Sequence, residues 1–313
     1  MPFKQEPQRF MAKINTLAVG SGGNEITLGG ESVLPFYSFD APIECCPKIG
    51  VAISDSGYYK GVPGIEEYFS GADTAIDAAK IAAAMPGVDF LVVCLEGAHP
   101  EKGDKSPAEC AALVKDIVET VDIPVAVEGC RNIDKDALLF EKVAEAVQGK
   151  NVLILSAREE NYKAIAAAAG LAYSHKVGAE SAVDINLAKQ LNVLISQIGV
   201  KTGNMAMNLG SAAAGYGFEY VVSTIDRVKS AALAQSDAML QMPIVTPVYS
   251  ETWAVKESIA DEADYPEWGS AELRGVHMEV ATAAACLAAG SNAVILRHPE
   301  SIAAVSALIQ ALA

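Results

Sequence analysis

Two carboxylates lie at positions where neighbouring parallel strands would bring them close together. Glu96 and Glu128 each come directly after a short run of Val, Leu, Ala and Cys residues. Carboxylates at adjacent strand ends can do acid–base chemistry, because the charge of one raises the pKa of the other. The alternative is structural: one of them pairs with Arg131 or Arg158 and holds two loops together.

Other polar side chains occupy comparable positions at the ends of apolar runs. They are Ser156, Asn208, Thr246 and Arg297. Their common placement, rather than any one residue, indicates a site. Lys176 also ends an apolar run, and a desolvated lysine there could form a Schiff base. A lyase or aldolase that uses Glu96, Glu128 or Lys176 is therefore one alternative.

Cysteine and histidine residues are scattered without the spacing that metal sites usually need. The six cysteines include no C-x-x-C pair, and no H-E-x-x-H or H-x-H spacing occurs. The sequence therefore predicts neither a metal site nor an iron–sulfur cluster in this chain.

Two glycine-rich segments differ in their surroundings. Residues 20–23 lie between two apparent strands, and no G-x-G-x-x-G or G-K-[ST] sequence occurs, so no nucleotide site is expected there. Residues 210–217 follow a predicted strand and precede a predicted helix. Free N–H groups at that helix start could hold an anion or an amide, and a plain loop is the alternative.

The elements that must position these residues alternate between apolar runs and helical patterns. Continuous apolar runs suit parallel strands that are buried on both faces. Eight strand–helix units predict an α/β fold, the (β/α)8 TIM barrel, with the polar strand ends at one mouth. The expected strands are 48–54, 90–95, 125–127, 152–155, 171–176, 205–207, 244–248 and 293–296. The expected helices are 72–84, 107–120, 135–147, 162–169, 184–198, 218–234, 271–289 and 301–312.

Residues 1–45 are expected to form an N-terminal extension ahead of a barrel over residues 46–313. Within the extension, segments 14–19 and 25–28 could pair as a hairpin around the glycine-rich turn. We expect this hairpin to close the bottom of the barrel. No linker rich in Pro, Gly and Ser divides the rest of the chain, so we expect one domain there.

The net charge of −16 argues against nucleic acid and anionic membranes as partners, because both bind basic surfaces. The start of the chain, residues 1–6, is polar and lacks the apolar core of a signal peptide. No window reaches the roughly 18 uninterrupted apolar residues of a membrane span. We therefore expect a cytoplasmic protein.

Several longer segments carry a resemblance to a known family. They are Tyr37-Ser38-Phe39-Asp40-Ala41-Pro42, Val127-Glu128-Gly129-Cys130, the segment 155–162, the segment 189–194, Gly217-Phe218-Glu219-Tyr220 and the segment 223–227. With these segments, the chain from about residue 26 onward resembles the small (delta) subunit of the corrinoid iron–sulfur protein of the anaerobic acetyl-CoA pathway of carbon fixation.

The resemblance implies a (β/α)8 barrel that forms a heterodimer with a large corrinoid iron–sulfur subunit. In that family a corrinoid (cobalamin), which contains cobalt, lies between the two subunits and faces the barrel mouth, and the [4Fe–4S] cluster belongs to the partner only. Methyltetrahydrofolate methyltransferase and acetyl-CoA synthase are the further partners that it implies. The chain is then expected to be a methyl carrier that is not catalytic alone, with no catalytic residue of its own.

Residues 201–210 are the best candidate for a contact loop with the corrinoid. Met and Gly side chains allow close apolar approach, and Asn side chains can bond the amide groups of the ring. The residues expected to face the corrinoid are Thr202, Gly203, Asn204, Met205, Asn208, Gly210, Thr246 and Arg297. The other candidates at the rim are Glu96, Glu128 and Ser156.

A free-standing pterin-dependent methyltransferase is the main alternative, since the family's barrel resembles those enzymes. Asn208 looks like the asparagine with which they hold the pterin. Glu96, however, stands where their Asp-x-Asn pattern would be expected. This departure favours a carrier subunit over an enzyme that binds a pterin by itself.

Overall fold

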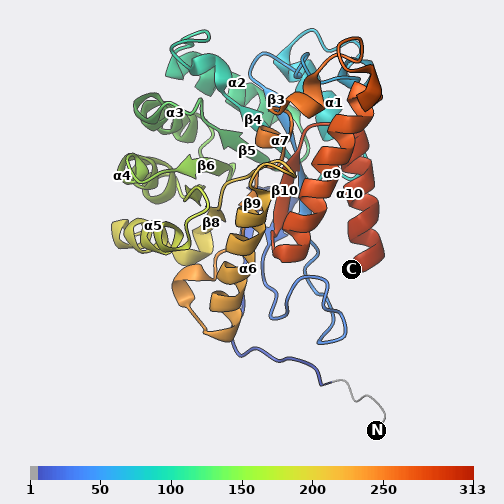
Figure 1. Cartoon of the computed structure of the whole chain (residues 1–313). Helices are drawn as coiled ribbons and strands as arrows, with labels where there is room; N and C mark the ends of the chain where they lie inside the picture. The colour runs from blue at the N-terminus through green and yellow to red at the C-terminus, as the bar shows by residue number, and fades with distance from the viewer. Residues whose placement is uncertain (1–5) are drawn as a thin grey trace.

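The computed structural model describes residues 6–313, so residues 1–5 of the predicted extension and its polar start lie outside the described residues. Eight parallel strands form a barrel with helices around its outside (Figure 1). The strand order is β8-β7-β6-β5-β4-β3-β10-β9. A parallel bridge between Met207 and Ile244 joins the two end strands, so the barrel is nearly closed. The predicted fold class is confirmed.

The barrel strands are short and their side chains are almost all buried. They are β3 (Lys48–Ser54), β4 (Phe90–Cys94), β5 (Val125–Glu128), β6 (Leu153–Ala157), β7 (Lys176–Glu180), β8 (Met205–Asn208), β9 (Val245–Thr246) and β10 (Ala293–Leu296). Burial on both faces explains why most of these strands are continuous apolar runs rather than alternating ones. All pairs are parallel, so every strand ends at the same mouth.

The helices pack their apolar faces against the outside of the barrel. They are α1 (Ala75–Ala83), α2 (Pro107–Thr120), α3 (Ile133–Ala146), α4 (Tyr162–Ile165), α5 (Ile185–Ile198), α6 (Phe218–Ala234), α7 (Tyr249–Thr252), α8 (Lys256–Ile259), α9 (Ala271–Ala289) and α10 (Pro299–Leu312). The start of α2 shows how the local sequence fixes where a helix begins. Ser106 and Glu109 form a capping box, and Pro107 is the first helical residue. Among residues 6–313, no helix is long and apolar enough to cross a membrane.

The predicted hairpin is present at the base of the barrel. Strands β1 (Leu17–Ser21) and β2 (Asn24–Leu28) pair antiparallel. Asn151, just before β6, donates its side-chain amide to the carbonyl oxygens of Ala18 and Gly20. The hairpin therefore lies against the end of the barrel where the strands begin, as expected. The division of the chain at residue 45 stays a prediction.

The fifth predicted strand, 171–176, is wrong. The chain continues from α4 in a π-helical segment, Ala166–Ala172, and β7 begins only at Lys176. Strand β7 is hard to recognise because it contains Gly178, where an added Cβ would lie 2.6 Å from the Leu155 side chain. The seventh strand is also shorter than predicted, because α7 follows β9 after only two residues.

Candidate functional site

Polar side chains surround a cavity of about 210 Å³ in the mouth of the barrel, where the strands end. Glu96, Glu128 and Arg297 line it together, as their positions at the ends of β4, β5 and β10 predicted. Tyr249, at the start of α7, lies on the same cavity. Three of the predicted rim residues therefore share one site.

Arg297 lies flat between two tyrosine rings. Its guanidinium carbon is 3.3 Å from the ring centre of Tyr59 and 4.5 Å from that of Tyr249. The side chain is only 9% exposed, and Nε is buried without a hydrogen-bond partner in the described part of the chain. Stacking on both faces fixes the plane of the guanidinium, while its N–H edges stay free to donate.

A buried carboxylate fixes the backbone of Arg297. Glu279, in the middle of α9, is fully buried and accepts hydrogen bonds from the backbone N–H groups of Arg297 (2.8 Å) and His298 (3.2 Å). These groups belong to the turn between β10 and α10. Glu279 therefore positions the arginine without lining the cavity.

The two predicted carboxylates each accept a hydrogen bond from a tyrosine hydroxyl. Tyr249 donates to Glu128 (2.5 Å), and Tyr59 donates to Glu96 (3.1 Å). The sulfur of Cys94 lies 3.0 Å from the hydroxyl oxygen of Tyr249. Because the hydroxyl proton of Tyr249 goes to Glu128, the thiol of Cys94 is left to donate to Tyr249.

Ion pairs add to these contacts. Arg131 lies 3.5 Å from Glu128, and Lys102 lies 3.1 Å from Glu96. The structural alternative, in which a rim carboxylate pairs with Arg131, is therefore confirmed for Glu128. Both carboxylates hold loops together at the mouth, which does not prevent them from contacting a ligand there.

Burial is the main cause of the pKa shifts of Glu128, Cys94 and Tyr249. Burial raises the pKa of Glu128, although Arg131 and Tyr249 oppose the shift. Burial also raises the pKa of the Cys94 thiol to about 12 and lifts the pKa of Tyr249 well above its usual value. The thiol and the hydroxyl therefore stay protonated at neutral pH, so the cluster keeps its donors.

Glu128 gives a pH dependence of stability with a definite sign. Its pKa in the folded protein lies above the ordinary 4.5, so the folded state holds the proton more tightly than the unfolded chain. The stabilisation that follows is complete below pH 4.5 and is lost as the pH rises through the raised pKa. Glu128→Gln, which does not ionise, should show a smaller loss of unfolding free energy between about pH 4 and pH 8, measured by urea denaturation.

Glu119→Gln, an exposed carboxyl on α2, is the matched control and should keep the wild-type pH profile. Parallel profiles for the wild type and Glu128→Gln would show that Glu128 titrates normally.

A second cavity, of about 180 Å³, adjoins the first and shares Glu128 and Arg131 with it. Arg158 and Glu180 form an ion pair of 2.8 Å on its wall. Ser211 also lines it, and the buried hydroxyl of this serine has no partner within residues 6–313. The two cavities make the mouth a continuous polar surface with balanced charges.

Asn208 and Gly210 lie at this second cavity, as predicted. The Asn208 amide donates to Ser156 (3.0 Å) and to Glu180 (3.4 Å), and its oxygen accepts from the backbone N–H of Gly210 (3.0 Å). Ser156 is buried beneath it and meets the cavity only through Asn208.

The prediction that Thr202, Gly203, Asn204 and Met205 lie at the mouth is wrong. Thr202–Asn204 form a short helical turn just before β8, and Met205 is the buried first residue of that strand. Residues that precede a parallel strand lie at the base of the barrel, opposite the mouth. The side chain of Asn204 there accepts a hydrogen bond from Lys176 (2.6 Å).

The predicted positions of Thr246 and Lys176 at the mouth are also wrong. Thr246 is fully buried and bonded to Ser291, which precedes β10 (2.7 Å). Lys176 begins β7 instead of ending a strand, so it lies at the base and cannot act with Glu96 or Glu128. The aldolase alternative that used Lys176 is therefore wrong.

Three residues of the site, Tyr59, Tyr249 and Glu180, were not predicted from the sequence, whereas Ser211 lies in the predicted segment 210–217. Glu180 would have followed from the correct bounds of β7, since it is the last residue of that strand. Tyr249 follows β9 closely and could have been found by the same rule. No local pattern marks Tyr59, because it lies in a loop whose course depends on the rest of the barrel.

The structure resembles solved barrels of another activity. Dihydropteroate synthase from Xanthomonas albilineans superposes with a TM-score of 0.56 at 12% identity, covering 95% of this chain and 98% of that one. The enzyme from Yersinia pestis gives 0.56 at 12% identity, covering 94% and 98%. At this level of identity the likeness supports the TIM-barrel fold alone.

Sequence relatives are much closer. Acetyl-CoA decarbonylase/synthase complex subunit delta 2 of Methanosarcina acetivorans is 32% identical over 302 residues, which cover 94% of this chain and 67% of the relative. The delta subunit of Methanothermobacter thermautotrophicus is 30% identical, covering 96% and 76%. The family model described as CO dehydrogenase/acetyl-CoA synthase delta subunit matches residues 16–300. The chain therefore belongs to the CO dehydrogenase/acetyl-CoA synthase delta subunit family.

Proposed function

We propose that this chain is a methyl-carrier subunit that encloses a corrinoid between its barrel mouth and a large [4Fe–4S] subunit. In this role it serves methyl transfer from methyltetrahydrofolate methyltransferase to acetyl-CoA synthase. Bound corrinoid supplies a cobalt ion that accepts and donates the methyl group. The residues of this chain bind, orient and shield the cofactor, and the iron–sulfur cluster belongs to the partner.

The observation that carries the proposal is the free arginine at the mouth. Arg297 is fixed between Tyr59 and Tyr249, and no hydrogen bond from its guanidinium to an acceptor is found within residues 6–313. A planar donor group of this kind is complementary to a ligand with several oxygen acceptors. The amide side chains at the edge of a corrinoid ring present such acceptors.

The other groups of the mouth also fit a corrinoid. The hydroxyl of Ser211 is buried without a partner at the second cavity, so an amide of a ligand could satisfy it. The charges of Glu128, Arg131, Glu180 and Arg158 are paired, so a large neutral surface that covers the mouth leaves none of these four charges without a partner. A cover of this kind excludes water from the reacting metal.

Exposed apolar side chains beside the mouth suit a partner subunit. Tyr216, just before α6, is 52% exposed, and Tyr220, in the first turn of α6, is 67% exposed. Ile259 of α8 is 44% exposed. The hydroxyl of Tyr216 donates to Glu257 of α8 (2.6 Å), which joins the two segments. Exposed tyrosines next to a polar cavity are typical of the rim and core of protein interfaces.

The contacts of Asn208 favour the carrier over the pterin-dependent methyltransferase. Its amide already donates to Ser156 and its oxygen already accepts from Gly210. Its second amide N–H donates to Glu180 (3.4 Å), so a pterin would find only the remaining lone pair of the oxygen free.

Anaerobic co-expression with a large corrinoid iron–sulfur subunit tests the proposal. We expect a 1:1 complex that contains cobalt and iron, with the visible absorption of a corrinoid, while this chain alone is colourless. Metal analysis and the visible spectrum of the purified complex provide the measurement. A chain that forms a homodimer and binds methyltetrahydrofolate without a partner would overturn the carrier and favour the methyltransferase.

A further inference from the structure

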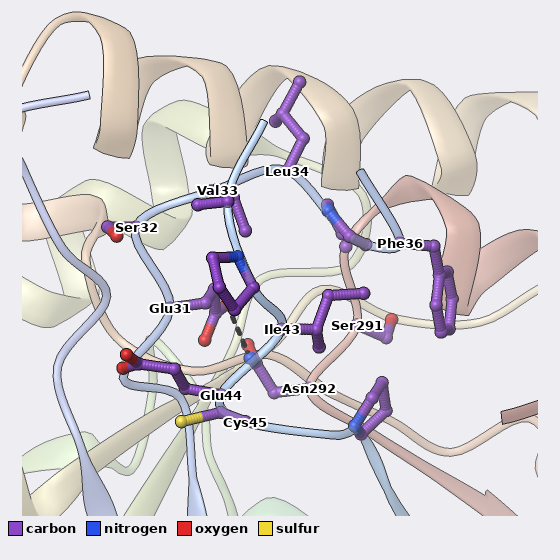
Figure 2. A pocket seen from close by; sticks show the side chains of 15 residues that line it. Glu31, Ser32, Val33, Leu34, Phe36, Ile43, Glu44, Cys45, Ser291 and Asn292 are labelled. Carbon is purple, nitrogen blue, oxygen red and sulfur yellow. Dashed lines mark hydrogen bonds between the residues drawn. The ribbon is translucent and has the colours of Figure 1, made fainter. Parts of the chain in front are cut away.

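A third cavity, called the base cavity below, lies at the base of the barrel, at the opposite end from the mouth. Residues 31–47 fold over the end of α9 and the start of β10 and enclose a cavity of about 90 Å³ (Figure 2). Val33, Leu34, Phe36 and Ile43 form its apolar walls. This segment includes the Tyr37–Pro42 motif, which the proposed function does not use.

Two polar residues of this cavity, Glu31 and Asn292, belong to a buried cluster around an ion pair. Lys229 of α6 is 1% exposed and lies 2.6 Å from Oε1 of Glu31. Asn292, just before β10, donates to the same oxygen (2.7 Å) and accepts from Lys229 (2.8 Å). The other oxygen of Glu31, Oε2, is buried and has no partner within residues 6–313.

The carboxyl of Glu31 is ionised in this setting. Burial alone would raise its pKa, but the charge and hydrogen bond of Lys229 outweigh burial and lower the pKa. A buried ionised oxygen without a donor is costly. Lys229 already balances the charge, so the group that Oε2 lacks is a neutral donor rather than a second cation.

Water would find few buried polar partners in this cavity. A single water needs about 10–15 Å³ and two to four polar partners, and a cavity of about 90 Å³ has room for about six atoms heavier than hydrogen. The hydrogen-bonding groups of Asn292 are used by Glu31, Lys229 and Ile244, and the Ser291 hydroxyl is bonded to Thr246. Ser32 and Glu44 also line the cavity but are exposed. Among the buried side-chain atoms of the walls, the acceptor left open within residues 6–313 is Oε2 of Glu31.

We infer that the base cavity is a binding site for a compact apolar molecule with one neutral hydrogen-bond donor, such as an aliphatic alcohol or amide. The donor bonds Oε2 of Glu31, and the apolar body contacts Val33, Phe36 and Ile43. The site is separate from the mouth, so it stands or fails independently of the proposed function.

Cyclopentanol is a suitable probe, and cyclopentanone is its matched control because it has the same number of heavy atoms but no donor. We expect saturable shifts of the Val33, Leu34 and Ile43 methyl NMR signals with cyclopentanol. Cyclopentanone should bind about tenfold more weakly or worse, because a hydrogen bond to a charged acceptor is lost. The complete chain is used in each titration.

Ile43→Trp fills the cavity and should abolish cyclopentanol binding. Val33→Phe, on another wall, provides the same test if the first variant does not fold. Leu138→Trp, at an exposed position on α3, should bind as the wild type does. Shifts that increase linearly without saturation, equal binding of the two probes, or binding retained in the filled variants would each overturn the inference.

Discussion

Arg297→Met is expected to weaken the complex with the large corrinoid iron–sulfur subunit by about 30-fold to 1,000-fold. This range corresponds to the ~2–4 kcal/mol of a central interface residue. The expectation rests on the proposed function and on the position of Arg297 between Tyr59 and Tyr249 at the mouth. Calorimetric titration of the two purified subunits under anaerobic conditions measures the dissociation constant.

Arg297→Lys should not restore affinity, because an ammonium group cannot stack flat between two rings or donate from a planar edge. Arg227→Met, at an exposed position on α6, is the matched control and should bind normally. An Arg297→Met chain that binds as tightly as the wild type would exclude a direct role for the guanidinium at the interface.

Lys229→Met should lower the free energy of unfolding by about 3–5 kcal/mol, the largest effect on stability that we expect from a single substitution. The substitution leaves the carboxylate of Glu31 buried without its cation. The loss should shrink in acid, because protonation of Glu31 removes the uncompensated charge. Urea denaturation at neutral and acidic pH, followed by circular dichroism, provides the measurement.

The double variant Lys229→Met with Glu31→Leu is the informative control. Replacing both members of a buried ion pair with apolar residues is often neutral or stabilising, so most of the lost stability should return. If the double variant is as unstable as Lys229→Met alone, the loss comes from packing of the lysine stem against Gly290 rather than from the charge.

The sequence predicted the barrel because most strands are apolar runs that need burial on both faces. β4 and β10 were recognised on this basis within one residue of their bounds. β7 was missed because Gly178 and Lys176 interrupt its apolar pattern, although Gly178 is required by the packing of Leu155. In this case packing against the neighbouring strand, rather than the local sequence pattern, determined where the strand forms.

Candidate site residues were placed correctly only where they lie at or just after the C-terminal end of a strand, and wrongly where they precede or begin one. Glu96, Glu128 and Arg297 follow their strands and lie at the mouth. Residues 202–205 were predicted to lie at the mouth, although they come before β8 or begin it. They lie at the base, the opposite end of the barrel.

Contacts between distant parts of the chain left no local signal. Lys229 and Glu31 are 198 residues apart, and Asn292 and Glu31 are 261 apart. Tyr59 meets Arg297 only because β3 and β10 are neighbours in the barrel. Such pairs become visible only when the whole fold is known.

The pairing of the first barrel strand with the last has a consequence for biosynthesis. β3 forms its ladder with residues 293–296, and Arg297 follows directly. A growing chain emerges from the ribosome with its N-terminal part first, so β3 lacks one neighbour until residues 293–296 have emerged. The mouth is therefore incomplete until Arg297 has been made and β10 has paired with β3, and assembly with a cofactor or another subunit there must follow that step.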